Sequence, residues 1–244
     1  MLTIVRSSLY FIWFALVSAA LNIGGLPLLL FSRRVTMWAP KAWCAGLLWG
    51  LKWIAGLDYE VRGTVPADGV LVASKHMSMW DTMALYHTIN DSVFVLKHSL
   101  MNVPLYGWYA RKVGMIAIDR DAGASALRSM TAAARDALLK RRTIVIFPEG
   151  HRMQPGAAPD YKPGVAGLYG QLDVPCVPVA LNSGLFWTGP AGFLKKRGCI
   201  VLEYLEPIPA GLRRAEFMRI LEERIESATA RLVAEGRAAL AADS

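Results

Sequence analysis

The first 57 residues of this 244-residue chain contain no aspartate or glutamate, and the first acidic residue is Asp58. Within them, residues 7–32 carry no charged side chain at all. An uncharged apolar stretch of this size meets the roughly 20-residue length that a membrane-spanning helix needs. The N-terminal segment is therefore predicted to lie in or on a membrane, and an ordinary water-exposed fold is expected only after it.

The way in which this segment meets the membrane stays open. An asparagine, two glycines and a proline between residues 22 and 27 are expected to interrupt the helix. Arginines flank both ends of the apolar stretch, so one span and a re-entrant hairpin with both ends on the cytoplasmic side fit the charges equally well. A cleavable signal peptide is disfavoured, because apolar character resumes beyond the small residues where cleavage would occur.

Residues 38–57 mix apolar side chains with Lys41 and Lys52, and five of the eight tryptophans lie in the first 57 residues. Tryptophan and lysine both suit the headgroup region of a bilayer, so a helix lying in the interface is predicted here. A hydrophobic helix packed on the domain is the alternative. The expected organisation is a membrane-anchoring helical segment over 1–57 and an α/β domain over 58–244.

The overall composition excludes several classes of protein. Apolar residues make up 54% of the chain and charged residues 19%, which argues against intrinsic disorder. The three cysteines lie far apart without a Cys-x-x-Cys pair, so a disulfide scaffold or structural zinc site is not expected, and a reducing compartment fits better. The net charge of +8 indicates anionic partners. It is concentrated at the tryptophan-rich apolar end, which makes nucleic-acid binding the weakest interpretation.

After residue 57 the pattern changes to short apolar runs that alternate with helical periodicity. This alternation is typical of an α/β fold, and strands without polar alternation are typical of a mostly parallel central sheet flanked by helices. Helices are predicted over 82–89 and 215–234 and around 127–138. The basic run 195–197 is predicted to be a solvated loop. The predicted strands are 70–74, 93–96, 115–118, 143–147, 176–180 and 199–204.

Polar side chains directly follow three of these strands. They lie in the segments 75–81, 119–120 and 148–152. In an open α/β sheet the ligand sits beyond the carboxyl ends of the parallel strands. If the strands are parallel, imidazole, carboxylate and guanidinium groups therefore gather at one edge of the sheet.

His76 and Asp81 are five residues apart, too far around a continuous helix to touch easily. Ser78 and Asp81 form a capping-box pattern, which places Ser78 at the N-cap, Asp81 in the first turn and His76 in the preceding loop. Asp81 can then reach back to the imidazole, fix its tautomer and leave the other ring nitrogen free to take a proton. The alternative is that Asp81 only caps a helix and His76 is a loop histidine.

Two other kinds of site find less support. The remaining histidines are scattered, and no further histidine or cysteine stands at ligand spacing from His76, so a metal site is not predicted. A serine hydrolase is also not predicted, because the Gly-x-Ser-x-Gly elbow is absent from the sequence.

Four ordered motifs resemble those of the 1-acylglycerol-3-phosphate acyltransferase family, of the bacterial PlsC type, and the resemblance covers about 58–209. They are the His-x4-Asp motif at 76–81, Gly-Met-Ile-Ala-Ile-Asp-Arg at 114–120, Phe-Pro-Glu-Gly-His-Arg at 147–152 and Val-Pro-Cys-Val-Pro-Val at 174–179. Two positions depart from the family pattern: His151 stands where threonine is usual, and Lys75 stands where asparagine is common.

The resemblance implies a role for each motif residue. His76 is implied as the general base, oriented by Asp81. The basic residues are implied to hold the acceptor's phosphate, for which guanidinium groups are well suited, and Glu149 and Gly150 are implied to shape the turn and hydrogen-bond the glycerol. The implied phosphate-binding cations are Lys97, Arg120 and Arg152.

The implied function is transfer of an acyl chain from acyl-CoA or acyl carrier protein to the sn-2 hydroxyl of lysophosphatidic acid, giving phosphatidic acid. Neither a metal nor a cofactor is expected, and the expected location is the inner membrane with the site facing the cytoplasm. Deletion of 1–57 is expected to leave a foldable domain with little activity on membranes. The alternatives are acylation of another lysolipid, such as a lyso-ornithine lipid, and a non-catalytic membrane lipid-binding protein.

Overall fold

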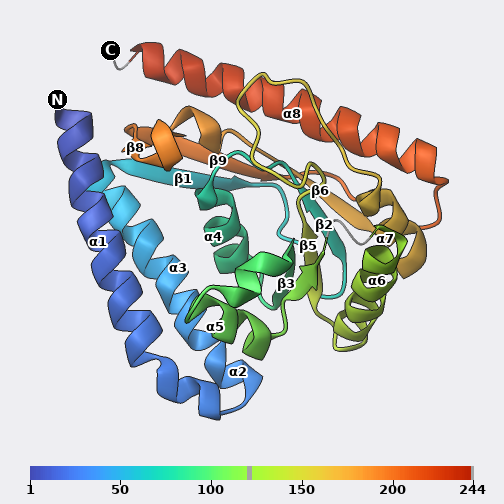
Figure 1. Ribbon diagram of the computed structural model, residues 1–244. Coiled ribbons are helices and arrows are strands. Elements are labelled where there is room, and N and C mark those ends of the chain that lie inside the picture. The colour runs from blue at the N-terminus through green and yellow to red at the C-terminus, as the bar shows by residue number, and fades with distance from the viewer. Residues whose placement is uncertain (120–122, 243–244) are drawn as a thin grey trace.

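A computed structural model of the chain describes residues 1–119 and 123–242. Seven strands form one sheet in the order β1-β9-β6-β2-β5-β3-β4, and β7 and β8 form a separate short pair (Figure 1). The strands are β1 Leu57–Arg62, β2 Leu71–Ser74, β3 Ser92–Lys97, β4 Ile116–Ile118, β5 Thr143–Ile146, β6 Cys176–Leu181, β7 Trp187–Thr188, β8 Leu194–Lys195 and β9 Gly198–Tyr204. The helices are α1 Leu2–Gly24, α2 Arg33–Thr36, α3 Trp38–Gly50, α4 Met79–Thr88, α5 Tyr106–Val113, α6 Gly123–Leu139, α7 Gly164–Leu172 and α8 Arg214–Ala242.

The prediction of a mostly parallel sheet is confirmed. β6, β2, β5, β3 and β4 all run in one direction, whereas β9 pairs antiparallel with β6 and β1 pairs parallel with β9. The carboxyl ends of the five parallel strands therefore meet at one edge of the sheet. The six predicted strands are all present, and the prediction missed β1 and the β7–β8 pair.

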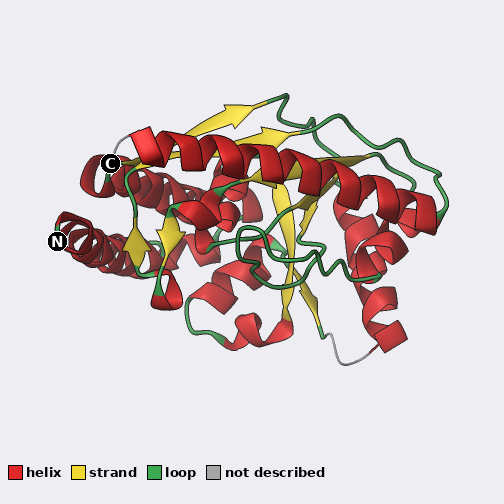
Figure 2. Ribbon diagram, turned by 90° about the horizontal axis from the view of Figure 1, so that it is seen from above, coloured by secondary structure: helices red, strands yellow, loops and turns green. Residues whose placement is uncertain are grey.

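Helices bury both faces of the sheet, which is why its strands are apolar without alternation. On one face, Val72 of β2 packs in a cluster with buried residues of α3 and α4. On the other face, Leu71 and Ala73 of the same strand pack with residues of α6, α7 and α8. In Figure 2 the C-terminal helix α8 crosses the whole molecule.

The N-terminal helices form an arm along the outer side of the first face (Figure 1). Helix α1 ends at Gly24 and is followed by a 3₁₀ turn over Leu26–Leu30, so the predicted interruption is present. The two long helices of the arm approach closely, because a Cβ atom on Gly50 would lie 2.2 Å from the Trp13 ring. The Trp13 indole also donates a hydrogen bond to the carbonyl oxygen of Gly46 at 2.9 Å.

The arm has one side that the protein does not cover. The segment Leu2–Leu30 is long and apolar enough to cross a membrane, and an 18-residue window within it has a mean hydropathy of 1.8. Several of its large apolar side chains are more than half exposed, including Phe11 and Leu16. Helix α3 differs, because Leu47 is completely buried in the main core while Trp49 is exposed. The arm is therefore both part of the core and the carrier of an exposed apolar surface.

Candidate active site

The carboxyl edge of the parallel strands carries the polar residues that the sequence singled out. β2 ends at Ser74 and leads into Lys75 and His76, and β5 ends at Ile146 and leads into the segment 147–152. These two strands are hydrogen-bonded neighbours, so their ends lie side by side. The expected gathering of polar groups at one edge is thus a consequence of the observed topology.

His76 and Asp81 are in direct contact. The His76 Nδ1 atom lies 2.9 Å from Oδ2 of Asp81. Ser78 is the N-cap of α4 and forms a capping box with Asp81, as the spacing predicted. His76 precedes the helix, and this break in the helical path lets residues five apart meet. A carboxylate at Nδ1 holds a proton on that nitrogen, and Nε2 is left with a free lone pair.

Asp81 is fixed by far more than the imidazole. Its Oδ2 also accepts the backbone N–H groups of Met77 and Ser78, at 2.6 and 2.8 Å. Its Oδ1 accepts hydrogen bonds from the hydroxyls of Ser78 and Ser183. The side chain of Asp81 is completely buried. These donors satisfy the buried carboxylate on both oxygens and hold it rigidly beside His76.

The His76 ring is also held on its flat side. It stacks on Phe147 with 4.0 Å between the ring centroids and 18° between the planes. The His76 side chain retains 13% exposure, so one part of it stays accessible. An oriented tautomer, a rigid carboxylate and an accessible ring edge are the requirements of a general base.

A buried ion cluster lies beside this pair. Lys75, only 2% exposed, contacts Glu149 Oε1 at 2.7 Å and Glu226 Oε1 of α8 at 2.8 Å through Nζ. Tyr161 donates its hydroxyl to the same Glu226 oxygen at 2.9 Å. Burial raises the pKa of Glu149, and the ammonium group of Lys75 opposes that rise. Oε2 of Glu149 is buried and has no hydrogen-bond partner within the described residues.

The structure places the other predicted residues as follows. Gly150 has φ +73°, a backbone conformation that glycine adopts readily, at the turn after β5. Arg152 is exposed and directly precedes Met153, whose N–H donates to the carbonyl oxygen of His76 at 2.8 Å. Lys97 is exposed at the end of β3, on the same edge but beyond β5. Arg120 lies outside the described residues.

Four contributors were missed by the sequence-based assignment of site residues. Ser183, Glu226 and Tyr161 are far from the His-x4-Asp motif along the chain, and no spacing rule connects them to it. Lys75 was noticed as a departure from a family pattern and given no role. Its position between a strand and His76 was the available signal, because a lysine there must find carboxylates if it is buried.

Comparison with known proteins finds acyltransferases among the relatives of this chain. Residues 58–182 match a family model described as Acyltransferase. A 1-acyl-sn-glycerol-3-phosphate acyltransferase of Pseudomonas aeruginosa is 34% identical over 176 residues, which cover 71% of this chain and 68% of that protein. A lyso-ornithine lipid O-acyltransferase of the same organism is 28% identical over 215 residues, covering 80% of this chain and 78% of that protein.

The fold also has a solved counterpart. The crystal structure of the 1-acyl-sn-glycerophosphate acyltransferase PlsC from Thermotoga maritima matches with a TM-score of 0.77 and 19% sequence identity. The match covers 95% of this chain and 98% of that one. The α/β fold and the N-terminal helices are therefore shared over nearly the full length.

Proposed function

This chain belongs to the acyltransferase family, and on that premise we propose that it acylates the sn-2 hydroxyl of lysophosphatidic acid to give phosphatidic acid. The acyl donor is a thioester of coenzyme A or of acyl carrier protein. The observation that carries the proposal is the contact between His76 and the buried carboxylate of Asp81 at the carboxyl edge of the sheet. The reaction draws on no cofactor beyond the two substrates.

His76 acts as the general base. Its Nε2 takes the proton of the sn-2 hydroxyl while the hydroxyl oxygen attacks the thioester carbonyl. The tetrahedral intermediate collapses, the C–S bond breaks, and the leaving thiolate takes the proton back from the imidazolium. Asp81 holds the proton on Nδ1 and stabilises the imidazolium that forms during the attack. Direct attack needs no acyl-enzyme, because holding both substrates in line supplies much of the rate.

The acceptor's phosphate is bound by Lys97, Arg120 and Arg152, and Glu149 and Gly150 contact the glycerol. A phosphate monoester is matched by cations, and guanidinium groups can bind two of its oxygens at once. Oε2 of Glu149 is buried and accepts no hydrogen bond within the described residues. This supports the proposal that a hydroxyl of the substrate donates a hydrogen bond to it.

The test is a thioester-release assay with lysophosphatidate as acceptor. Loss of general-base help is expected to lower the rate of His76→Ala by about 10²–10⁴-fold. Thr88→Ala, which alters a half-buried hydroxyl of α4, is the matched control and should keep the wild-type rate. A purified His76→Ala enzyme that acylates lysophosphatidate near the wild-type rate would refute the role of His76.

A second acceptor follows from the lyso-ornithine lipid acyltransferase among the relatives. A phosphate-free acceptor has no use for Arg120 and Arg152. An assay in which the two lysolipids compete as acceptors, run on the wild type and on Arg152→Ala, distinguishes the two acceptors. Selective loss of the phosphate-containing acceptor in the variant supports lysophosphatidate, whereas equal loss of both acceptors contradicts a phosphate-binding role.

The substrates also account for the arm. Both the single-chain lipid and the product reside in a bilayer, whereas the thioester arrives from water. We propose that residues 1–57 are a membrane-contacting segment that holds the site of the α/β part, 58–244, at the cytoplasmic face of the inner membrane. The exposed apolar side of α1 supports this arrangement.

A further inference from the structure

We propose that Glu226, on the C-terminal helix α8, is a positioning residue for the active site. It acts through Lys75, which it shares with Glu149, and through Tyr161. The inference rests on the proposed acyl transfer and assigns to α8 a part in it. Residues 58–182, which match the family model, do not include α8.

Lys75 joins three segments that meet at the site. It follows β2 and immediately precedes His76 in the chain. Its Nζ contacts Glu149, which follows β5 and lies two residues after the Phe147 ring that stacks on His76. The same Nζ contacts Glu226 of α8. The relative position of the imidazole and the Glu149 carboxylate therefore depends on where this one ammonium group is held.

The burial of Lys75 explains why one carboxylate does not suffice. A lysine that is 2% exposed has lost its hydration, so its three N–H donors need partners inside the protein. Glu149 and Glu226 supply two of those partners. With Glu226 in place, the ammonium group stays between the two carboxylates. Without that charge, Glu149 is the one carboxylate within the described residues that still pairs with the ammonium group, so Lys75 shifts toward Glu149 and the adjacent His76 moves with it.

Glu226 holds a second part of the site through Tyr161. The segment after β5 passes over His76, where Met153 donates to the carbonyl oxygen of His76, and returns to Pro148, whose carbonyl accepts the N–H of Lys162 at 2.8 Å. Tyr161 stands at the end of this segment and donates to Glu226. Figure 1 shows the segment between β5 and α7 reaching α8. One glutamate thus anchors both the loop before α4 and the loop after β5.

The cluster carries more negative than positive charge. Glu149 and Glu226 share a single ammonium group, and the proximity of Glu226 adds to the rise in the pKa of Glu149. Removal of Lys75 leaves these two carboxylates facing each other with no cation between them. When Lys75 is absent, loss of the Glu226 charge removes the repulsion between the two carboxylates. In the wild type, the same loss removes one of the two carboxylates that hold Lys75 in place.

The experiment is a double-mutant cycle measured by thioester release with lysophosphatidate in detergent micelles. It uses the full-length chain as wild type, Glu226→Gln, Lys75→Met and the double variant. Glutamine keeps the size and one acceptor oxygen, so Glu226→Gln tests the charge. Its kcat is expected to fall about tenfold because small misplacements of reacting groups are costly, while the KM for the thioester stays within about twofold.

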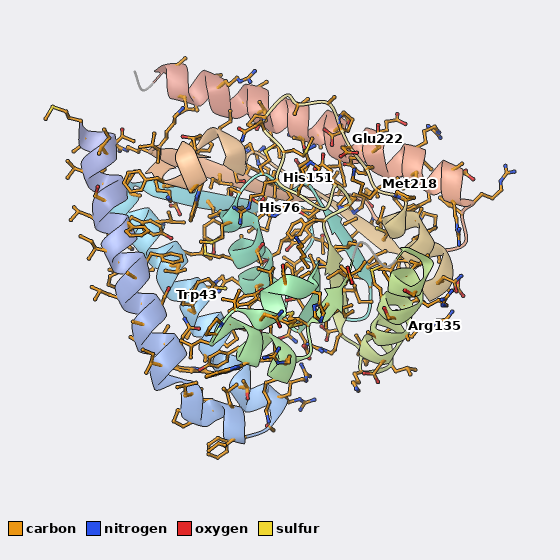
Figure 3. The ribbon with its side chains drawn as sticks, viewed as in Figure 1. Trp43, His76, Arg135, His151, Met218 and Glu222 are labelled. Atoms are coloured by element: carbon orange, nitrogen blue, oxygen red, sulfur yellow. The ribbon has the colours of Figure 1, made fainter. Side chains whose placement is uncertain are left out.

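Glu222→Gln is the matched control. Glu222, labelled on α8 in Figure 3, lies one turn before Glu226 and close enough to Tyr161 to act on it electrostatically, but no hydrogen bond or ion pair joins it to Lys75 within the described residues. Its kcat and melting temperature should stay at the wild-type values. In the Lys75→Met background, Glu226→Gln should leave kcat unchanged or restore part of it, because the path through Lys75 is already broken.

Two results would overturn the positioning role while leaving the proposed function intact. One is a Glu226→Gln enzyme with the kcat of Glu222→Gln. The other is a tenfold loss that recurs in full in the Lys75→Met background, which would mean that Glu226 acts independently of Lys75. A wild-type enzyme that releases no thiol with lysophosphatidate would overturn the proposed function and, with it, this role. Activity that is lost in His76→Ala but unaffected in Glu226→Gln would overturn the positioning role alone.

Discussion

The carboxyl edge of the sheet, which carries the candidate active site, and the N-terminal arm differ in the side chains that they expose to water. The edge buries ionisable groups, whereas the arm exposes apolar ones. At the edge, Lys75, Asp81 and Glu149 are at most 2% exposed although all three are ionisable. On the arm, Phe11 and Leu16 are more than 60% exposed although both are apolar. A buried charge is stable only with partners, and those are present. An exposed apolar side on a helix is typical of a surface that contacts a membrane, which is the medium proposed for α1.

The two regions nevertheless share one hydrophobic core, because Leu47 of α3 packs in the same cluster as Met77 and Trp80 beside the site. A polar contact adds to this attachment. Arg33 of α2 forms two hydrogen bonds with Asp91, which precedes β3, and Arg142 binds the same carboxylate. Burial alone would raise the pKa of Asp91, but the hydrogen bonds from both arginines lower it. In its use of paired charged groups, this attachment of the arm resembles the site edge more than it resembles the apolar face of α1.

Deletion of residues 1–57 tests this attachment and should have the largest effect. The sequence suggested a domain that folds without them, but Leu47, Leu51 and Ala55 are at most 1% exposed within the main core. Their loss would open the face of the sheet that α3 covers, at a cost of about 2–5 kcal/mol for each large side chain. The truncated chain should show no cooperative thermal unfolding by circular dichroism.

A cooperative thermal transition in residues 58–244 would contradict the shared core. Deletion of 1–30, which keeps α3, is the milder control.

Asp81→Asn should have the next largest effect, because it removes the charge of a completely buried group that contacts His76 directly. Asparagine keeps the shape but cannot stabilise the imidazolium or hold the proton on Nδ1 as a carboxylate does. We expect kcat to fall by about 10²-fold or more, measured by thioester release. Ser183→Ala removes one hydrogen bond to the same carboxylate and keeps the charge, so its loss should be several-fold. Equal losses in the two variants would mean that the Asp81 charge is not used.

The difference between the regions also explains what the sequence could predict. Local sequence patterns predicted the strands, the N-cap at Ser78 and the contact between His76 and Asp81, because each of these features depends on residues only a few positions apart. The partners of Lys75 and Asp81 that come from α8 and the segment after β6 depend on tertiary packing, which spacing does not encode. The strand β1 was missed because it combines charged and apolar residues at the edge of the sheet, where one side of the backbone is unpaired.

The exposed side of α1 yields a prediction on membrane binding. Phe11→Glu combined with Leu16→Glu places two carboxylates where lipid contact is proposed, and each carboxylate is costly to transfer from water into a bilayer. Co-flotation with liposomes should fall about tenfold. The melting temperature in detergent should change little, because both side chains are exposed. Leu139→Glu is the matched control, since Leu139 is 86% exposed on α6, away from the arm. A similar loss of flotation in both proteins would show that α1 is not the lipid-binding face.

Lys195 gives the sharpest contrast with Lys75, because it is a buried lysine at the junction of the two regions. The basic run 195–197 was predicted to be solvated, and that was wrong for Lys195, which is 5% exposed. Its Nζ donates to the carbonyl oxygens of Gly192 and Phe193 and lies 4.1 Å from the centroid of the Trp187 ring. No carboxylate pairs with it within the described residues, and burial lowers its pKa to about 8.

The sign of the resulting pH effect follows from this lowered pKa. The unfolded chain, with a lysine pKa near 10.5, binds more protons than the folded protein between pH 8 and 10.5. The contribution of Lys195 to stability is therefore complete above about pH 10.5 and is lost as the pH falls through 8. The free energy of unfolding of the wild type, relative to Lys195→Met, should rise by on the order of 1 kcal/mol between pH 7.5 and 10, measured by denaturant titration in detergent. Lys196→Met, an exposed neighbour, is the control. A pH-independent difference between wild type and Lys195→Met would contradict the lowered pKa and would mean that the two carbonyls and the Trp187 ring compensate for the burial of this ammonium group.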